Sequence, residues 1–336
     1  MTKHMQKRKR KSSFPHQTVT MGGGTGTYPV LKALRQLPTQ ITALVVASDS
    51  GGSTGRIRDE FGFVPVGDLR QSLAALTHDQ SQTWISKLLL YRFEKGKGLK
   101  GHNLGNLILT ALQDMTQTTT QALEIASAIF RLPGKVIPIT EDRVKLKIHY
   151  RDGTWAIGEH LLDEAQVPKK AIDRVSLVPK AKINPVAKQT IDQAQTIIIG
   201  PGDYYASLMA VLVTPGVKLA LKKFPGQIIY IVNLMTRQSQ THGMSVADHV
   251  RGIEKIIGRP LTKIIVNQTP VPPAILKQYQ KAGDLPVVDD LKFDPRVIEA
   301  DLINQTPYQT TSADQLTRSL LRHDADKLKQ ILAPLI

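Results

Sequence analysis

A short apolar strand, a cluster of glycines, a helix and a second apolar strand follow one another near the start of the chain. The run Thr18–Met21 leads into Gly22–Gly26, and apolar residues then recur at helical spacing between Tyr28 and Leu37. Ile41–Ala47 is almost continuously apolar, which is typical of a parallel strand buried on both faces. Because a strand–helix–strand unit is right-handed and needs a parallel sheet, the sequence predicts an α/β fold.

The rest of the chain repeats these elements and adds a small antiparallel part. Residues 68–132 carry apolar side chains at helical spacing. Residues 144–150 then alternate polar and apolar side chains, and a turn signal at 151–154 precedes 155–157. We therefore expect a hairpin subdomain at 134–182. Further strands are predicted at 196–199, 228–232 and 264–266.

Composition and charge limit the classes of function. The 336 residues contain no cysteine, which excludes disulfides, thiol nucleophiles and cysteine-ligated metals. Lys and Arg number 44 against 28 Asp and Glu, a net charge of +16. Residues 3–11 hold six of these positive charges, so we expect a disordered basic tail at 1–16 and one domain at 17–336. The net positive charge of the rest of the chain fits a ligand that carries phosphates.

The tail and the apolar runs also bear on location. No apolar run of the length of a signal peptide follows the basic residues, and no stretch is apolar enough to span a membrane. We expect a cytoplasmic protein without a membrane span. A basic tail binds anions without sequence preference, so no specific nucleic-acid partner is expected.

The first predicted strand exit is rich in glycine. Ligands of open α/β sheets bind beyond the carboxyl ends of strands, where loop amides and helix N-termini converge. Gly22, Gly23, Gly24, Thr25 and Gly26 follow the first strand, and glycines there let backbone N–H groups approach a phosphate and permit positive φ. The segment is neither a Walker A loop nor a strict G-x-G-x-x-G. The alternative is a tight turn that allows close strand–helix packing.

The second strand exit combines hydroxyls, glycine amides, a carboxylate and a guanidinium. Arg56 could pair with a phosphate, while Asp49 could bind a ribose or a magnesium ion. A flexible Gly/Ser loop is the alternative. The candidate residues of this exit are Ser48, Asp49, Gly51, Gly52, Ser53, Thr54, Gly55 and Arg56.

Three more segments carry similar chemistry. Asp68, followed by Arg70, is expected to be the N-cap of a helix. A second helix start, at residues 101–106, offers side chains that could contact phosphate or sugar. In the alternative interpretation, Asn103 only caps the helix. The loop at 200–203, after the strand predicted at 196–199, is expected to point its backbone amides toward the same end of the sheet, although an ordinary turn would explain these residues too. The residues of the last two segments are His102, Asn103 and Asn106, and Gly200, Pro201, Gly202 and Asp203.

The ordered set of motifs resembles the CofD-like proteins, and within them the YvcK group, often labelled gluconeogenesis factors. The motifs are G-G-G-T-G at 22–26, S-D-x-G-G-S-T-G-R-I-R at 48–58, G-D-L-R at 67–70, G-H-N-L-G-N at 101–106, D-G-x-x-x-x-G-E at 152–159, G-P-G at 200–202, N-L-M-T at 233–236, D-H-V at 248–250 and R-H-D-x-x-K-L at 322–328. The chain departs from the family in two loops. Asp203–Ala206 stands in place of Ser-Leu-Tyr-Thr, and Arg237–Thr241 in place of a Pro-Gly-Glu-Thr stretch.

The resemblance implies a three-layer, Rossmann-like, mostly parallel sheet with helices on both faces. It also implies that the candidate residues above line a nucleotide crevice together with Asn233, and with Arg322 reaching in from the C-terminal helix. The YvcK group is associated with UDP-sugars such as UDP-N-acetylglucosamine, with cell shape and cell-wall synthesis, and with growth on gluconeogenic carbon sources. We expect a homo-oligomer.

Three functions stay open on the sequence. The preferred one is a nucleotide-sugar-binding regulator that makes no bond and requires no cofactor. The CofD branch implies a magnesium-dependent transferase that moves a 2-phospholactyl group from a guanosine-diphosphate carrier, and Asp49 would then hold the metal. An NAD(P)-dependent oxidoreductase is the third reading, favoured by the first strand–helix–strand unit.

Overall fold

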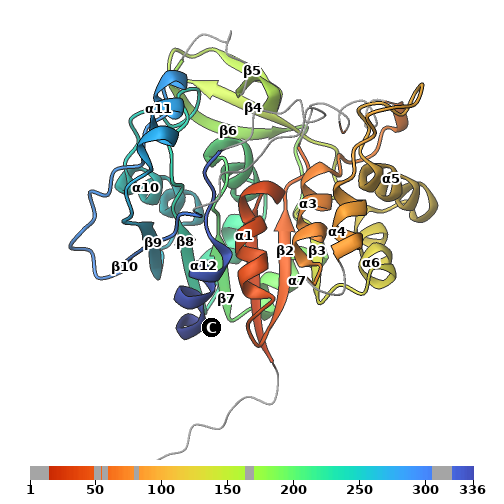
Figure 1. The fold of residues 1–336 in the computed structure, drawn as a ribbon, viewed down its shortest axis with the longest axis horizontal. Coiled ribbons are helices and arrows are strands. Elements are labelled where there is room, and N and C mark those ends of the chain that lie inside the picture. The colour runs from red at the N-terminus through yellow and green to blue at the C-terminus, as the bar shows by residue number, and fades with distance from the viewer. Residues whose placement is uncertain (1–14, 49–53, 55–59, 79–82, 163–169, 305–319) are drawn as a thin grey trace, which may run out of the picture.

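The computed structural model describes residues 15–48, 54, 60–78, 83–162, 170–304 and 320–336. In this part of the chain, one seven-stranded parallel sheet has the order β10-β9-β8-β7-β1-β2-β3 (Figure 1). Its strands are β1 (His16–Gly22), β2 (Thr39–Val45), β3 (Gly134–Pro138), β7 (Thr196–Ile199), β8 (Gln227–Ile231), β9 (Lys263–Asn267) and β10 (Val297–Ala300).

Apolar strands explain the centre of this sheet. All of β7 is buried, and only the first residue of β8 is partly exposed. Such runs bury both faces and therefore need a layer of helices on each side. The predicted mostly parallel sheet with helices on both faces is confirmed.

Helices cover the two faces with separate apolar cores. One core includes residues of α1, α3, α5, α6 and α12, and Figure 1 shows α1 and α12 side by side on that face. The other includes residues of α7, α8, α9 and α10. The helices are α1 (Gly24–Leu34), α3 (Gly67–Leu76), α4 (Thr83–Leu90), α5 (Leu104–Thr116), α6 (Thr119–Ile129), α7 (Pro185–Gln193), α8 (Ala210–Leu212), α9 (Val217–Lys223), α10 (Val246–Ile257), α11 (Pro273–Ala282) and α12 (Ala325–Leu332). Shorter turns are the 3-10 helices η1 (Glu159–Leu162) and η3 (Ala333–Leu335) and the π-helix η2 (Tyr204–Met209).

A small antiparallel sheet lies above the end of the main sheet where β1 finishes (Figure 1). Its order is β5-β4-β6, with β4 (Lys145–Tyr150), β5 (Trp155–Ile157) and β6 (Ile172–Val178). The predicted hairpin corresponds to β4 and β5, and β6 adds a third strand. These strands fall inside the range 134–182, whereas β3 of that range pairs with β2 in the main sheet.

The strand order creates a switch point beside β1. The chain runs from β1 to β2 and β3 on one side, and then returns to place β7 and β8 on the other. Loops leaving β1 and β7 therefore diverge to opposite faces, and α/β sheets generally bind their ligands at the carboxyl ends of the strands beside such a switch point. The predicted site segments at 22–26, after β1, and at 200–203, after β7, meet there.

Among the described residues, no single helix has the length and apolar character needed to cross a membrane. One pair of helices, Tyr204–Leu212 and Val217–Lys223, meets these two criteria together but is bent by 72° at the break between them.

Candidate functional site

The N-terminus of α1 lies at the switch point. Gly23 is the N-cap, and it offers no side chain to the backbone N–H groups of the first turn, which contains no acidic residue. Both the backbone N–H and the hydroxyl of Thr27 donate to the Gly23 carbonyl, so helical bonding begins at that residue. The N–H groups of Gly24, Thr25 and Gly26 precede this bond and can donate to an anion. Thr25 and Gly26 are partly exposed, whereas residues 22–24 are buried.

Packing explains why this turn consists of glycines. A Cβ on Gly23 would come 2.5 Å from the Ser207 hydroxyl oxygen and 2.8 Å from a carboxylate oxygen of Asp68. A Cβ on Gly24 would collide with the backbone of α3, and one on Gly26 with Pro201 and Gly202. None of these glycines has a positive φ, so the prediction that they permit positive φ is wrong. The tight-packing alternative accounts for their small size.

The loop after β7 packs against the first turn of α1, where Gly26 lies close to Pro201 and Gly202. Gly200 has φ +73° and is followed by a cis peptide bond to Pro201. The side chain of Asn233, just beyond β8, holds this loop: its amide nitrogen donates to the Gly202 carbonyl at 2.7 Å, and its oxygen accepts from the Gly202 N–H at 3.3 Å. Asn233 therefore positions the loop, since both of its polar groups are engaged with Gly202.

An ion pair joins the loops that follow β7 and β8. The Asp203 carboxylate lies 3.4 Å from Nε of Arg237. Nearby, the backbone N–H of Gln238 donates to Asp284 at 2.7 Å. Burial raises the pKa of Asp284, and the adjacent Arg237 opposes that rise. These side chains bring both signs of charge to the loops that follow β7 and β8.

Asp68 presents its carboxylate to the α1 turn from the start of α3. The N-cap of α3 is Val66, without a side-chain cap, and Asp68 is the second helical residue, so the predicted capping role is wrong. Its carboxylate oxygen lies against Gly23 instead. We define the strand-end site as Gly22–Gly26, Asp68, Gly200–Asp203 and Asn233.

Arg70 lies behind this site in a buried hydrogen-bond network. Its Nε donates to the Asn106 side-chain oxygen at 2.7 Å and its Nη1 to the Leu89 carbonyl at 3.0 Å. Asn106 donates in turn to the Thr54 hydroxyl at 3.2 Å. Asn103 caps α5 by accepting from the Asn106 N–H. Three of the predicted segments are thus brought together, and their ligand contacts stay predictions.

Ser48 connects the second strand exit to η1, which follows the small sheet's strand β5, since its hydroxyl donates to Glu159 at 3.1 Å. His102 lies in a hairpin in which its carbonyl accepts from the Phe93 N–H. The remaining candidates of the second exit, including the proposed metal ligand, lie outside the described residues. They are Asp49, Gly51, Gly52, Ser53, Gly55 and Arg56.

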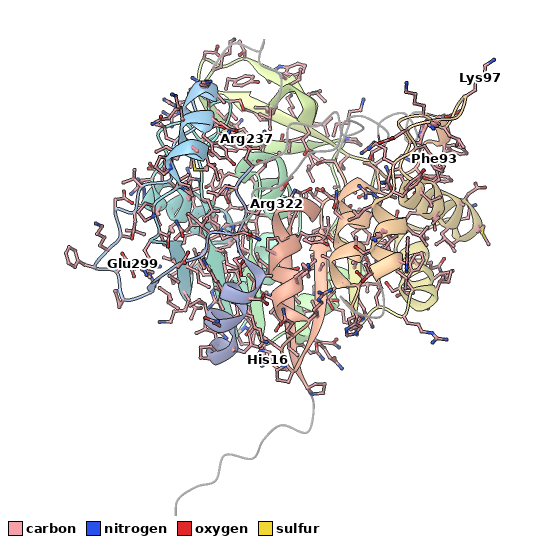
Figure 2. The ribbon with its side chains drawn as sticks, in the orientation of Figure 1. His16, Phe93, Lys97, Arg237, Glu299 and Arg322 are labelled. Atoms are coloured by element: carbon pink, nitrogen blue, oxygen red, sulfur yellow. The ribbon has the colours of Figure 1, made fainter. Side chains whose placement is uncertain are left out.

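The segment before α12 reaches the end of β8. Arg322 precedes α12, whose N-cap is Asp324, so its predicted place on the C-terminal helix is wrong. Figure 2 draws Arg322 and Arg237 on the side of the sheet where β1 ends, away from His16. His323 is buried, its Nε2 lies 3.1 Å from the Val232 carbonyl, and burial lowers its pKa to about 4.

Sequence reasoning missed three residues of this region. Ser207 and Arg237 flank the strand-end site, and Glu159 contacts Ser48. Glu159 closes one of the quoted motifs and could have been found from it, whereas Ser207 stands in no motif. In the described part of the chain, no group of three or more His, Asp or Glu side chains is placed to hold a metal ion.

Comparison with known proteins gives consistent matches. Residues 18–305 match the family described as 2-phospho-L-lactate transferase CofD. The gluconeogenesis factor of Bacillus subtilis is 34% identical over 322 residues, covering 94% of this chain and 96% of that protein. The gluconeogenesis factor of Halalkalibacterium halodurans is 33% identical over 318 residues, with 94% of each chain covered. A crystal structure of a UPF0052 family member from Bacillus halodurans superposes with a TM-score of 0.85 at 31% identity, covering 96% of this chain and 99% of that one.

Proposed function

Because the chain belongs to the CofD family, in the group of the gluconeogenesis factors, we propose that its strand-end site binds a nucleoside diphosphate sugar. The proposed ligand is of the UDP-N-acetylglucosamine kind, and the protein acts as a regulator that links this ligand to cell shape, cell-wall synthesis and growth on gluconeogenic carbon. The names of the relatives support the link to carbon supply.

The observation that carries the proposal is the uncapped N-terminus of α1 at the switch point. The helix has eleven residues and begins directly after β1, at the switch point between β2 and β7. Helix N-termini favour negative charge because of the aligned peptide dipoles and the free N–H donors. A diphosphate supplies such charge, and Thr25 and Gly26 are accessible to it.

Acceptors beside this turn suit the hydroxyl groups of a sugar or a ribose. The Asp68 carboxylate and the Ser207 hydroxyl both lie against Gly23. A carboxylate accepts hydrogen bonds from hydroxyls, while it repels a phosphate. The combination therefore fits a ligand that carries phosphate and hydroxyl groups side by side.

A transferase is the second candidate, favoured by the description of the matching family. Magnesium is bound in proteins by one or two carboxylates together with substrate phosphates. Asp68 supplies one carboxylate at the strand-end site, which fits this mode of binding, while Asp49, the ligand predicted from the sequence, lies outside the described residues. When bound, magnesium would neutralise phosphate charge, while Asp68 and Ser207 orient the hydroxyl groups of the substrate.

A thermal-shift panel tests these functions. The full chain is melted with UDP-N-acetylglucosamine, GDP, NAD(P) and a deazaflavin, each with and without magnesium. A ligand at 100 times its dissociation constant stabilises a protein by about 2.7 kcal/mol. We expect the UDP-sugar to raise the melting temperature in the absence of magnesium.

Asp49→Asn separates the regulator from the enzyme. For a regulator, this change alters affinity and no ligand is consumed by either protein. Cleavage of a UDP-sugar or a phospholactyl donor by the wild type, lost in Asp49→Asn, would establish the transferase instead. Stabilisation by NAD(P) alone would contradict both.

A further inference from the structure

Helix α4 exposes the apolar stripe that a surface helix normally buries. Trp84 and Leu88 on the helix, and Tyr91 directly after it, recur at spacings of four and three residues and are 74%, 45% and 51% exposed. Leu89 is the buried residue of this helix. Amphipathic helices turn such a stripe toward the core, and contiguous exposed apolar groups mark interaction sites.

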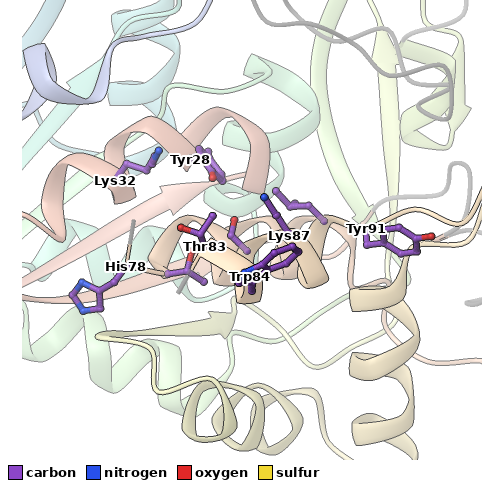
Figure 3. Close-up of a pocket in the computed structure, with 10 residues that line it drawn as sticks. Tyr28, Lys32, His78, Thr83, Trp84, Lys87 and Tyr91 are labelled. Carbon is purple, nitrogen blue, oxygen red and sulfur yellow. The ribbon is translucent and has the colours of Figure 1, made fainter. Parts of the chain in front are cut away.

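Positive charges accompany the stripe. Lys87 lies on the same helical face, and its ammonium sits 4.5 Å from the centre of the Trp84 ring. Figure 3 labels both side chains. The following loop, 94–100, is exposed throughout and carries Lys95, Lys97 and Lys100 against one acid, Glu94. None of the ion pairs found in the described residues involves these lysines.

This surface combines a hollow with a projecting loop. Trp84, Lys87 and Tyr91 line a cavity of about 550 Å³ together with Tyr28 and Lys32 of α1 (Figure 3), whereas loop 94–100 projects. Figure 2 shows Lys97 at the end of a loop that projects beyond the body of the protein. Gly96 and Gly98 have φ of +98° and +88°, and a Cβ on Gly98 would meet nothing within 4 Å. Leu99, in the same loop, is 43% exposed. A projecting corner suits a broad, deformable partner better than a partner with a protruding surface of its own.

We propose that this surface docks the protein on an anionic lipid bilayer. The α4 surface, defined as Trp84, Lys87, Leu88, Tyr91 and loop 94–100, would place its aromatic and leucine side chains at the level of the headgroups. Basic amphipathic elements with Trp and Leu bind bilayers in this way, and lysines near the surface add attraction to anionic lipids.

Other partners fit these side chains less well. A two-fold contact between copies of the chain would bring the same lysines against one another, because such an interface is self-complementary. Nucleic acid would satisfy the lysines and stack on Trp84 and Tyr91, but it offers no apolar environment to Leu88 and Leu99. Of these three partners, the bilayer alone satisfies both the charge and the aliphatic groups.

The chain contains two tryptophans, which allows a matched experiment. Trp155, on β5, is 57% exposed and also lies beneath a lysine, with Lys147 Nζ 4.2 Å from its ring centre. In full-length Trp155→Phe, fluorescence reports on Trp84, and in Trp84→Phe it reports on Trp155. Each variant is mixed with vesicles of phosphatidylcholine alone and of equal parts phosphatidylcholine and phosphatidylglycerol, with and without brominated acyl chains.

We expect anionic vesicles to shift Trp84 emission to the blue and brominated lipids to quench it, while Trp155 does not respond. Leu88→Ser should weaken partitioning about tenfold, and Lys97→Ala about fivefold. Leu219→Ser and Lys222→Ala, exposed on α9 across the main sheet, are the controls and should leave partitioning unchanged.

Several outcomes would overturn the proposal. Binding without a change at Trp84 would assign the attraction to other basic segments, such as residues 3–11. A response of Trp84 to duplex DNA but not to vesicles would make nucleic acid the partner. Equal partitioning into neutral and anionic vesicles would remove the role given to the lysines.

Discussion

The carboxylate of Asp203 lies 3.4 Å from Nε of Arg237 and thereby links the loops that follow β7 and β8. Both residues stand in the stretches where this chain departs from the family pattern. Two departures that are far apart in sequence therefore meet in space as opposite charges. Their side chains are 36% and 25% exposed, so the pair contributes at most about 1 kcal/mol to stability.

Asp203 and Arg237 should affect ligand binding in opposite directions. Asp203→Asn removes a negative charge from the strand-end site, so we expect the affinity for UDP-N-acetylglucosamine to rise. Arg237→Gln removes the positive charge and should lower it. Titration calorimetry at low and high salt measures both effects, and a double variant gives the coupling between the two side chains. Parallel changes in both single variants would contradict this electrostatic role.

Gly24 and Gly202 should separate folding from binding. In Gly24→Ala, the new methyl group collides with the carbonyl of Asp68 and with Gln71 on α3, so we expect a loss of stability of about 3 kcal/mol. In Gly202→Ala, the methyl group lies 3.3 Å from Leu208 and 3.9 Å from the nitrogen of Gly23, so the fold should tolerate it.

The binding readout completes this comparison. Because the methyl group of Gly202→Ala points toward the N-cap of α1, we expect it to weaken UDP-sugar binding while urea unfolding changes little. A normal melting temperature for Gly24→Ala together with lost binding would reverse the assignment and return Gly24 to a ligand contact.

The sequence predicts the centre of the fold well because the central strands are buried on both faces. Thr196–Ile199 and Ile41–Val45 are apolar runs that local pattern alone identifies. The sequence does not predict that β1 lies between β2 and β7, because the pairing of β1 with β7 joins residues about 180 positions apart. It also misses β10, whose four residues include a polar one and lie at the sheet edge.

The candidate site shows the same division between local and distant information. Glycines after a strand predict a crowded turn, but whether a phosphate or a protein backbone crowds it depends on the distant segments 68–71 and 201–202. The N-cap of α3 is Val66 rather than Asp68, and the carboxylate of Asp68 lies against Gly23 on a neighbouring element. Local capping rules cannot anticipate such a competing contact.

Arg70 should prove essential to stability, since it is 4% exposed and bonded to Asn106 and the Leu89 carbonyl. Arg70→Ala leaves those acceptors unpaired in the interior, and we expect it to lower the free energy of unfolding by about 3 kcal/mol. Arg70→Lys should recover little of the stability lost in Arg70→Ala, because an ammonium group cannot reproduce the forked hydrogen bonding of a guanidinium. Arg174→Ala, at an exposed position on β6, is the control. Urea unfolding would contradict this role if both arginines proved equally dispensable.

His323 should make stability depend on pH in the weakly acidic range. Its pKa is about 4 in the folded protein because of burial, against 6.5 in the unfolded chain. Above pH 6.5 both states are neutral, and the contribution of this residue to stability is fully present. As the pH falls from 6.5 toward 4, only the unfolded state binds the proton, so up to about 3 kcal/mol of the free energy of unfolding is lost.

In His323→Gln the amide can still donate to the Val232 carbonyl but does not titrate, so urea midpoints between these pH values should fall less steeply than in the wild type. His149→Gln, in the small sheet beside Ser176, should leave the slope nearly unchanged, since its pKa is lowered by only partial burial and nearby Arg174. Identical pH slopes for the wild type and His323→Gln would show that protonation of His323 does not oppose folding.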